Sequence, residues 1–494
     1  MTNFTFLDGA IVLLYLAATI TAGVLVRRYV GKVEHFLVAG REMDLYLGIA
    51  SMAATEFGIV TCMYTAQNGY DKGFSGAMPG LLLAGAMLLV GVTGFVIKPL
   101  RRAGVITIPE MFTKVYGEKI RWMSGVVIVV GGLLNMGVFL RTGGEFLVTV
   151  VGFDVGYLEV TMTFLLAGVA LYTIMGGMIS VLITDYLQFI IMSLGLLVVT
   201  ILIFTQIGWT TLTDAIQSNY GEGGFNPFLH PDMGWDYMIF NTLVALSIVL
   251  TWQTIIQRVL SSKSSEVGQK IYKGTSMFFV CRFILPGLWG IAALAVLTPD
   301  QVGDNTLLAM PKFLADFLPF GLMGVLIAAM LAADMSTDAA YMLSWGSVIY
   351  NDIMAPIHKG KWSEKKGLVV NRIIVGCIGV FLLVYGLWYP LKGDLWTYLT
   401  VTGSIYLASM SVLLIACCYW PRANRYGAAA AITIGAVMPV TYLILEQIPS
   451  TTNFVAHVIG PYIWGIITYA AAAAGMIAGS LLKKMPVSGN QEET

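Results

Sequence analysis

The chain has 494 residues, of which 57% are hydrophobic and 11% are charged, and its formal net charge is zero. Soluble globular proteins carry about 25% charged residues, so this composition excludes an ordinary soluble domain. The balanced charge gives no sign of a nucleic-acid partner. Apolar runs of about 20 residues recur from one end to the other. They predict one all-α, polytopic membrane domain that covers residues 1–494.

Thirteen apolar runs are long enough to be membrane spans, and polar or Gly/Pro-bearing stretches separate them. In chain order they cover residues 6–26, 45–68, 78–100, 121–151, 157–176, 179–207, 237–260, 270–297, 317–350, 368–390, 395–420, 427–445 and 458–482. No Lys or Arg precedes the first run, so we expect a retained span rather than a secretory signal. The tail at 485–494 is short and polar, and we expect it to be disordered.

The basic residues favour this count. Most of the 28 Lys and Arg residues fall in alternate loops, whereas Lys72, Lys312 and Lys392 fall in the loops between them. The positive-inside rule then predicts an N-terminus outside the cell and a C-terminus in the cytoplasm. We expect a multi-pass protein in the lipid of the plasma membrane, which is the inner membrane in a bacterium, and we expect it to work as a monomer.

The second span carries Glu56 near its middle and Gly58 two residues later. A charged group inside a membrane is costly and usually has a polar task. A Gly can interrupt a helix and expose its carbonyl groups. The pair therefore predicts a broken helix at a binding site. The alternative is that Glu56 forms a structural hydrogen bond with a neighbouring helix.

Polar groups recur in the fourth, sixth and seventh spans. They are Arg141, Glu145, Thr184, Asp185, Gln188, Trp252, Gln253, Gln257 and Arg258. The i,i+4 spacing of Arg141 and Glu145 favours a structural ion pair, and the alternative is that Arg141 contacts a substrate carboxylate. Gln257 and Arg258 lie at the predicted cytoplasmic end, where a gating or structural role is expected. Trp252 and Gln253 lie deeper and are candidates for substrate contact.

The ninth span contains the sequence Ala-Ala-Asp-Met-Ser-Thr-Asp at residues 332–338. Ala333, Ser336 and Thr337 share one helix face, and carbonyl and hydroxyl oxygens suit a weakly hydrated monovalent cation. Asp334 and Asp338 stand at i,i+4 on an adjacent face, so we expect one of them to be protonated, ion-paired or facing water. The alternative is that the two hydroxyl groups only bond back to their own helix.

Motifs for other functions are missing from the sequence. The four His residues do not have the spacing of metal ligands, and the five Cys residues form no CxxC pair. No phosphate-binding loop and no nucleophile motif is present. The chain is therefore predicted to be neither an enzyme nor an ATP-driven pump.

The chain resembles the sodium:solute symporter family, and within it the bacterial sodium/proline transporters. The resemblance rests on five motifs in the order that the family has them. They are His35–Arg41, Ile108–Phe112, Tyr172–Gly177 followed by Thr184–Asp185, Gln257–Arg258, and Ala333–Thr337. The resemblance implies a LeuT-type core of two inverted five-helix repeats, at about 45–207 and 237–420. Helices at 6–26, 427–445 and 458–482 flank this core.

The resemblance also implies a sodium site made of three carbonyl and two hydroxyl groups. Its ligands would be Ala54, Phe57, Ala333, Ser336 and Thr337. The supporting acids would be Glu56, Asp185, Asp334 and Asp338. Family members with a second sodium have hydroxyls where this chain has Ala339 and Ala340, so we expect one sodium ion per cycle.

The solute contacts implied by the resemblance are Gly58, Thr61, Arg141, Trp252 and Gln253. The leading hypothesis is sodium-coupled import of a small organic solute by alternating access. Three acids in two helices expected to touch favour an amino acid or amine over a neutral sugar or simple carboxylate. The alternatives are a proton-coupled symporter of the same fold and a solute-sensing membrane module.

Overall fold

The computed structural model describes residues 3–358, 362–389 and 393–482. Within these ranges the chain is helical, apart from turns, loops and one isolated bridge between Met43 and Ser262. The tail at 485–494, expected to be disordered, lies outside the described residues. Eleven helical segments of the described chain are long and apolar enough to cross a membrane, as expected for a multi-pass membrane protein.

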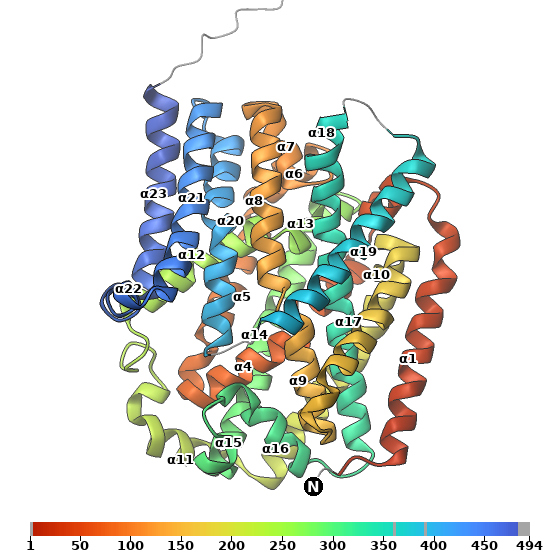
Figure 1. Ribbon diagram of the computed structural model, residues 1–494, viewed down its shortest axis with the longest axis vertical. Coiled ribbons are helices and arrows are strands. Elements are labelled where there is room, and N and C mark those ends of the chain that lie inside the picture. Colours follow the sequence, from red (N-terminus) through yellow and green to blue (C-terminus); the bar gives the residue numbers. More distant parts are fainter. Residues whose placement is uncertain (1–2, 359–361, 390–392, 483–494) are drawn as a thin grey trace, which may run out of the picture.

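The long helices form one bundle (Figure 1). They are α1 (Phe6–Val26), α3 (Leu45–Thr55), α4 (Ile59–Lys72), α5 (Met78–Thr93), α8 (Glu118–Met136), α9 (Phe139–Val151), α10 (Leu158–Gln206), α12 (Trp235–Thr251), α13 (Gln253–Ser261), α14 (Ser265–Val296), α17 (Leu322–Val348), α19 (Glu364–Trp388), α20 (Leu395–Tyr419), α21 (Arg425–Gln447) and α23 (Gly460–Leu482). The remaining helices connect them: α2 (Val33–Val38), α6 (Ile97–Arg102), α7 (Ile108–Tyr116), α11 (Trp209–Tyr220), α15 (Pro299–Val302), α16 (Ala309–Phe317), α18 (Ala355–His358) and α22 (Pro449–Asn453). Helix α1 begins at one end of the bundle and α23 ends at the other, as an odd number of crossings requires (Figure 1).

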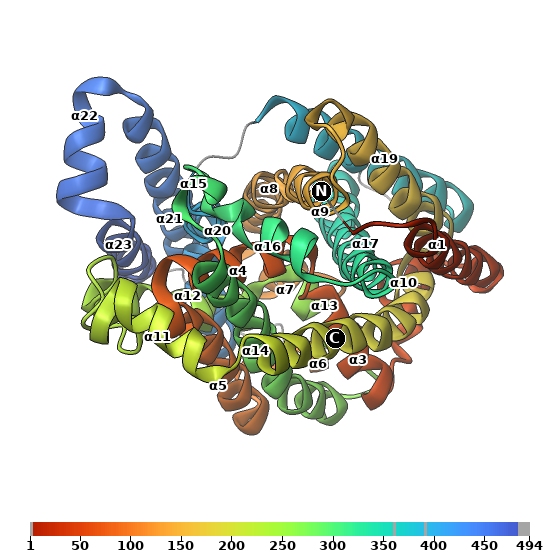
Figure 2. The ribbon, with the colours of Figure 1, turned by 90° about the horizontal axis from the view of Figure 1, so that it is seen from below.

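Helix α17 lies in the interior, and its residues are buried along almost the whole helix. It packs against α10, α1, α19, α3 and α8. At one edge of the bundle, α21 and α23 pack on each other and on α20, and α1 lies near the opposite edge (Figure 2). Because α17 lies in the interior, its polar residues are expected to find partners inside the protein.

Helix α10 is interrupted at Gly177, whose φ of 54° and ψ of −148° are not helical. A straight helix of its 49 residues would be about 74 Å long, more than twice the hydrocarbon thickness of a bilayer. The interruption divides α10 into two pieces of membrane-spanning length. They correspond to the separate spans predicted at 157–176 and 179–207. Only Gly fits here, because an added Cβ would lie 2.5 Å from the Phe36 ring.

The break predicted in the second span is present. Helix α3 ends at Thr55, the chain is not helical from Glu56 to Gly58, and α4 begins at Ile59. A Cβ on Gly58 would lie 2.8 Å from the Thr337 hydroxyl oxygen, so α17 packs directly on the break. The glycine thus allows the close approach of α17 to the break.

A second break, which the sequence does not predict, interrupts the seventh span. Trp252 has extended backbone (φ −65°, ψ 112°) between α12 and α13. Its indole nitrogen donates a hydrogen bond to the Tyr341 hydroxyl at 2.9 Å, and its ring stacks on Tyr406 with centroids 5.5 Å apart. Packing against α17 and α20 therefore stabilises the extended backbone of Trp252, which no Gly or Pro at this position predicts.

Candidate functional site

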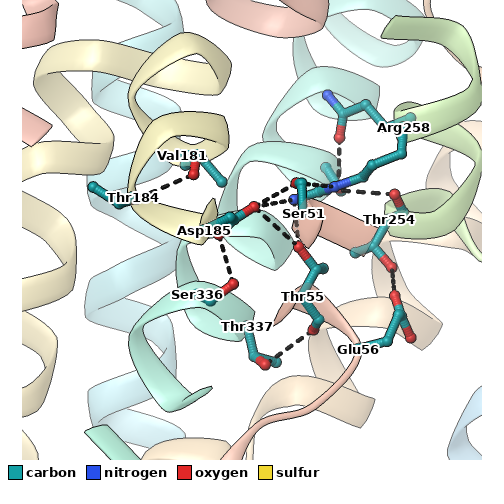
Figure 3. A network of polar contacts seen from close by, with 12 residues as sticks. Ser51, Thr55, Glu56, Val181, Thr184, Asp185, Thr254, Arg258, Ser336 and Thr337 are labelled. Atoms are coloured by element: carbon teal, nitrogen blue, oxygen red, sulfur yellow. Dashed lines mark hydrogen bonds and ion pairs between the residues drawn. The ribbon is translucent and has the colours of Figure 1, made fainter. Parts of the chain in front are cut away.

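The two hydroxyl groups of the predicted ion site face two different segments. Ser336 donates a hydrogen bond to Asp185 Oδ1 on α10 at 2.6 Å, and Thr337 donates to the backbone carbonyl of Thr55 at 2.9 Å (Figure 3). The alternative that both hydroxyls bond only to their own helix is therefore wrong. A hydroxyl that donates its proton keeps two oxygen lone pairs, which remain available to a cation.

The carbonyl ligands expected beside these hydroxyls are close by in the fold. Ala54 and Phe57 flank Thr55 at the break, and Ala333 lies one helical turn before Ser336 and Thr337 on α17. All three residues are buried. The fold thus brings the end of α3 against the polar face of α17. The carbonyl shown in contact with these hydroxyls is that of Thr55, which accepts from Thr337; carbonyl and hydroxyl oxygens are the ligand type that a hard cation prefers.

Asp185 is the centre of the buried polar network in Figure 3. Its Oδ2 accepts hydrogen bonds from Ser51 at 2.5 Å and from Thr55 at 3.4 Å, and it pairs with the Arg258 guanidinium at 3.4 Å. Arg258 also donates to the Thr55 hydroxyl at 2.6 Å. Arg258 and Asp185 are fully buried. Arg258 therefore supplies the positive charge that a buried carboxylate needs, which fits the structural role expected for it.

Glu56 has different neighbours from those expected of an acid beside the ion. Its Oε1 accepts a hydrogen bond from Thr254 at 2.6 Å, and its Oε2 lies 3.8 Å from Arg282 Nη1 on α14. No hydrogen bond among the described residues joins its carboxylate to Ser336 or Thr337. Asp185, rather than Glu56, is the acid in contact with a predicted ion ligand, because the chain turns at Glu56 and directs its side chain toward α13 and α14.

Asp334 and Asp338 are buried, and no ion pair reaches either of them within the described chain. Asp334 interacts with the backbone N–H of Ile59, the first residue of α4, where a helix N-terminus favours negative charge. Both oxygens of Asp338 and Oδ2 of Asp334 have no hydrogen-bond partner among the described residues. We expect one of these acids to be protonated, ion-paired or facing water. Among the described residues, neither acid has an ion-pair partner.

A cavity adjoins the helix break. Its lining includes Thr55, Glu56, Thr61, Tyr64, Asn135, Phe139, Trp252, Phe279, Arg282, Thr337, Tyr341, Trp396 and Thr400. A few polar groups among aromatic side chains are typical of small-molecule sites. Thr337, Thr55 and Glu56 belong both to the cavity wall and to the region of the break, so the two candidate sites share a wall.

Two of the five predicted solute contacts, Thr61 and Trp252, line this cavity. Gly58 is covered by Thr337, and Gln253 is buried with both polar atoms lacking a partner in the described residues. Arg141 lies outside the lining and pairs with Glu145 at 2.8 Å, as expected for a structural ion pair. A basic side chain does line the cavity, but it is Arg282.

The sequence reasoning missed several polar lining residues, among them Tyr64, Asn135 and Arg282. The one available signal was that Arg282 is basic and lies inside an apolar run, where an ionisable residue usually has a function. Nothing in the sequence indicated that α14 would place Arg282 beside Glu56, because the two residues are 226 positions apart.

The fold is shared with known transporters. A solved structure of a Na⁺-coupled sialic acid symporter, in a substrate-bound outward-open state, superposes with a TM-score of 0.81 at 20% identity and covers 98% of this chain and 100% of its own. Mhp1, a nucleobase-cation-symport-1 family transporter in a closed conformation, gives a TM-score of 0.56 at 15% identity, over 90% of this chain and 93% of its own.

Sequence comparison gives the family. Sodium/glucose cotransporter 4 of Danio rerio is 28% identical over 491 residues, which is 90% of this chain and 73% of the relative. The sodium/mannose cotransporter SLC5A10 of Bos taurus is 26% identical over 538 residues, which is 98% and 88%. The sodium:solute symporter family pattern matches residues 36–435. The chain therefore belongs to the sodium:solute symporter family, whose members are transporters rather than enzymes.

Proposed function

We propose that this protein imports a small polar organic solute by sodium-coupled symport and that the ion binds between α3 and α17. The proposed ligands are the carbonyl groups of Ala54, Phe57 and Ala333 and the hydroxyl groups of Ser336 and Thr337. The observation that carries the proposal is the contact between Thr337 and the carbonyl of Thr55 at the helix break, beside the cavity.

Residues shared by the cavity and the proposed ion site would couple sodium binding to solute binding. Thr337 lines the cavity and also touches the break, so an ion held there would fix the positions of Thr55 and Glu56, which line the same cavity. A ligand shifts a conformational equilibrium only through its different affinity for the two states. We propose that sodium binds the outward-open state more tightly.

One sodium ion per cycle fits the surroundings of Asp185. Family members with a second ion would use hydroxyls at positions 339 and 340, where this chain has buried alanines. The Arg258 guanidinium already lies 3.4 Å from Asp185. A second cation beside Asp185 would meet this positive charge, which disfavours its binding.

We place the transporter in the membrane with thirteen crossings. This count takes the pieces of α10 before and after Gly177 as two crossings and the α3–α4 pair as a crossing distinct from α5. The two repeats would cover about 45–207 and 237–420, with flanking helices at 6–26, 427–445 and 458–482. The N-terminus would face outward and the C-terminus the cytoplasm, in a plasma-membrane protein that works as a monomer in lipid.

Two classes of solute are candidates, an amino acid and a sugar. An excess of buried acids would favour an amine. However, Glu56 lies beside Arg282, and Asp334 and Asp338 do not line the cavity. The buried acids therefore do not require a cationic solute. The names of the relatives, which are glucose and mannose cotransporters, favour the sugar.

Two rivals remain testable against sodium coupling: proton coupling through a buried acid, and solute sensing without transport. The test is a thermal-stability screen of the purified protein with amino acids, amines, sugars and carboxylates, each in sodium and in choline buffer, followed by uptake of the stabilising compound into proteoliposomes. Sodium symport predicts stabilisation and uptake that both need sodium. Uptake that follows a pH gradient in choline indicates proton coupling, and stabilisation without uptake indicates a sensor.

A further inference from the structure

A charged pair lies on the cavity wall beside the helix break. Arg282 on α14 and Glu56 at the break are both buried, and both line the cavity. Their nearest charged atoms, Nη1 and Oε2, are 3.8 Å apart. Charge-assisted hydrogen bonds between nitrogen and oxygen are about 2.7–2.9 Å long. The two groups therefore neutralise each other at a distance without a direct hydrogen bond.

The Arg282 guanidinium has unused hydrogen-bonding capacity. Its Nη2 donates to the Tyr64 hydroxyl at 3.0 Å, whereas Nε and Nη1 have no hydrogen-bond partner among the described residues. Its planar face lies over the Phe279 ring, with the guanidinium carbon 4.5 Å from the ring centroid. Unpaired buried donors are costly, so a partner for Nε and Nη1 is expected.

We propose that Arg282 binds a carboxylate group of the transported solute, so that the substrates of this protein are carboxylate-bearing compounds such as α-amino acids or sugar acids. The proposal rests on the symport function above and specifies its substrate class. A carboxylate matches the fork of a guanidinium with two parallel hydrogen bonds, which a sugar hydroxyl or an amide cannot reproduce. An amine without a carboxylate would meet a positive charge instead.

The rest of the cavity fits a bifunctional solute. Glu56 Oε2 forms no hydrogen bond within the described residues and can accept one from an ammonium or hydroxyl group next to the carboxylate. The rings of Tyr64 and Trp396, with centroids 5.0 Å apart, form an apolar wall for the body of the solute. An α-amino acid and a hydroxy or sugar acid share this chemistry, and the experiment separates them.

The competing explanation is that Arg282 serves only to neutralise Glu56. A purely structural pair would make removal of Arg282 lower the stability of the protein, without changing which compounds bind. The two explanations therefore differ in ligand selectivity, which is measured on the wild-type protein as well as on variants.

The experiment measures ligand affinity by thermal shift in sodium buffer for matched pairs of compounds. The pairs are α-amino acids with their carboxamides and decarboxylated amines, and glucuronate and mannuronate with glucose and mannose. The variants are Arg282→Gln, Arg282→Lys and the control Arg121→Gln. Arg121 is also mostly buried and pairs with Asp352 at 2.8 Å, but it lies outside the cavity.

We expect at least one carboxylate compound to bind, with its neutral or amine partner at least tenfold weaker. Arg282→Gln should lose this ligand, Arg282→Lys should keep part of the affinity, and Arg121→Gln should keep it all. Stronger binding of glucose or mannose than of the uronates, or no binding by any carboxylate compound, would overturn the proposal. Stabilisation by sodium alone is scored separately, so that its loss counts against the symport function and not against the substrate class.

Discussion

Replacing both Ser336 and Thr337 with Ala should remove the response of the protein to sodium. The two hydroxyl oxygens lie at the contact of α17 with the helix break, where Ser336 reaches Asp185 at 2.6 Å and Thr337 reaches the Thr55 carbonyl at 2.9 Å. Each lost polar partner of a buried group costs about 1–3 kcal/mol. The pair should therefore weaken sodium affinity at least about 30-fold, since about 1.4 kcal/mol is a factor of ten.

The assay is a sodium titration of the melting temperature of the purified protein at constant ionic strength, with choline as the balancing cation. Ser347→Ala is the matched control, because Ser347 is buried on the same helix and its hydroxyl bonds only to the Ser344 carbonyl at 2.7 Å. This variant should keep the wild-type sodium affinity. A Ser336→Ala/Thr337→Ala protein that is folded and keeps that affinity would refute the assigned ion site.

Three further predictions follow from the same contacts. Sodium activation of uptake should be hyperbolic with a Hill coefficient near 1, since Arg258 already pairs with Asp185; a sigmoidal curve in a transport assay would require a second ion. Asp185→Asn should lower the free energy of unfolding by about 3–5 kcal/mol, because it removes the ion-pair partner of the buried Arg258 guanidinium. Adding Arg258→Gln should recover part of this loss, as measured by thermal unfolding. Gly58→Ala should lower both the melting temperature and sodium affinity, because its Cβ would lie 2.8 Å from the Thr337 hydroxyl, whereas Gly168→Ala, with 3.9 Å to its nearest neighbour, should change neither.

The elements that the sequence predicted well are those with a local signal. Gly58 after a mid-span acid indicated the first break, and Gly177 falls between two runs that were each long enough to span a membrane. The hydroxyl pair of α17 was recognisable because polar groups are costly in an apolar helix. These signals depend on residues a few positions apart, which is the range over which helix periodicity carries information.

The contacts that the sequence did not predict join distant segments. The break at Trp252 depends on hydrogen bonding and stacking with Tyr341 and Tyr406, and no residue beside Trp252 favours it by its own conformation. The pairing of Glu56 with Arg282 depends on the position of α14 beside the break. Tertiary packing decides both features, so local propensity could not reveal them.

The central claim, sodium-coupled symport, is tested most directly by solute uptake into proteoliposomes that contain the purified protein. The measurement uses the compound that stabilises the protein best, with an inward sodium gradient, or with sodium replaced by choline, each at two external pH values. We expect the solute to accumulate only with the sodium gradient, at both pH values. The Ser336→Ala/Thr337→Ala variant should not accumulate it. Accumulation in choline, or uptake that follows the proton gradient regardless of sodium, would contradict it.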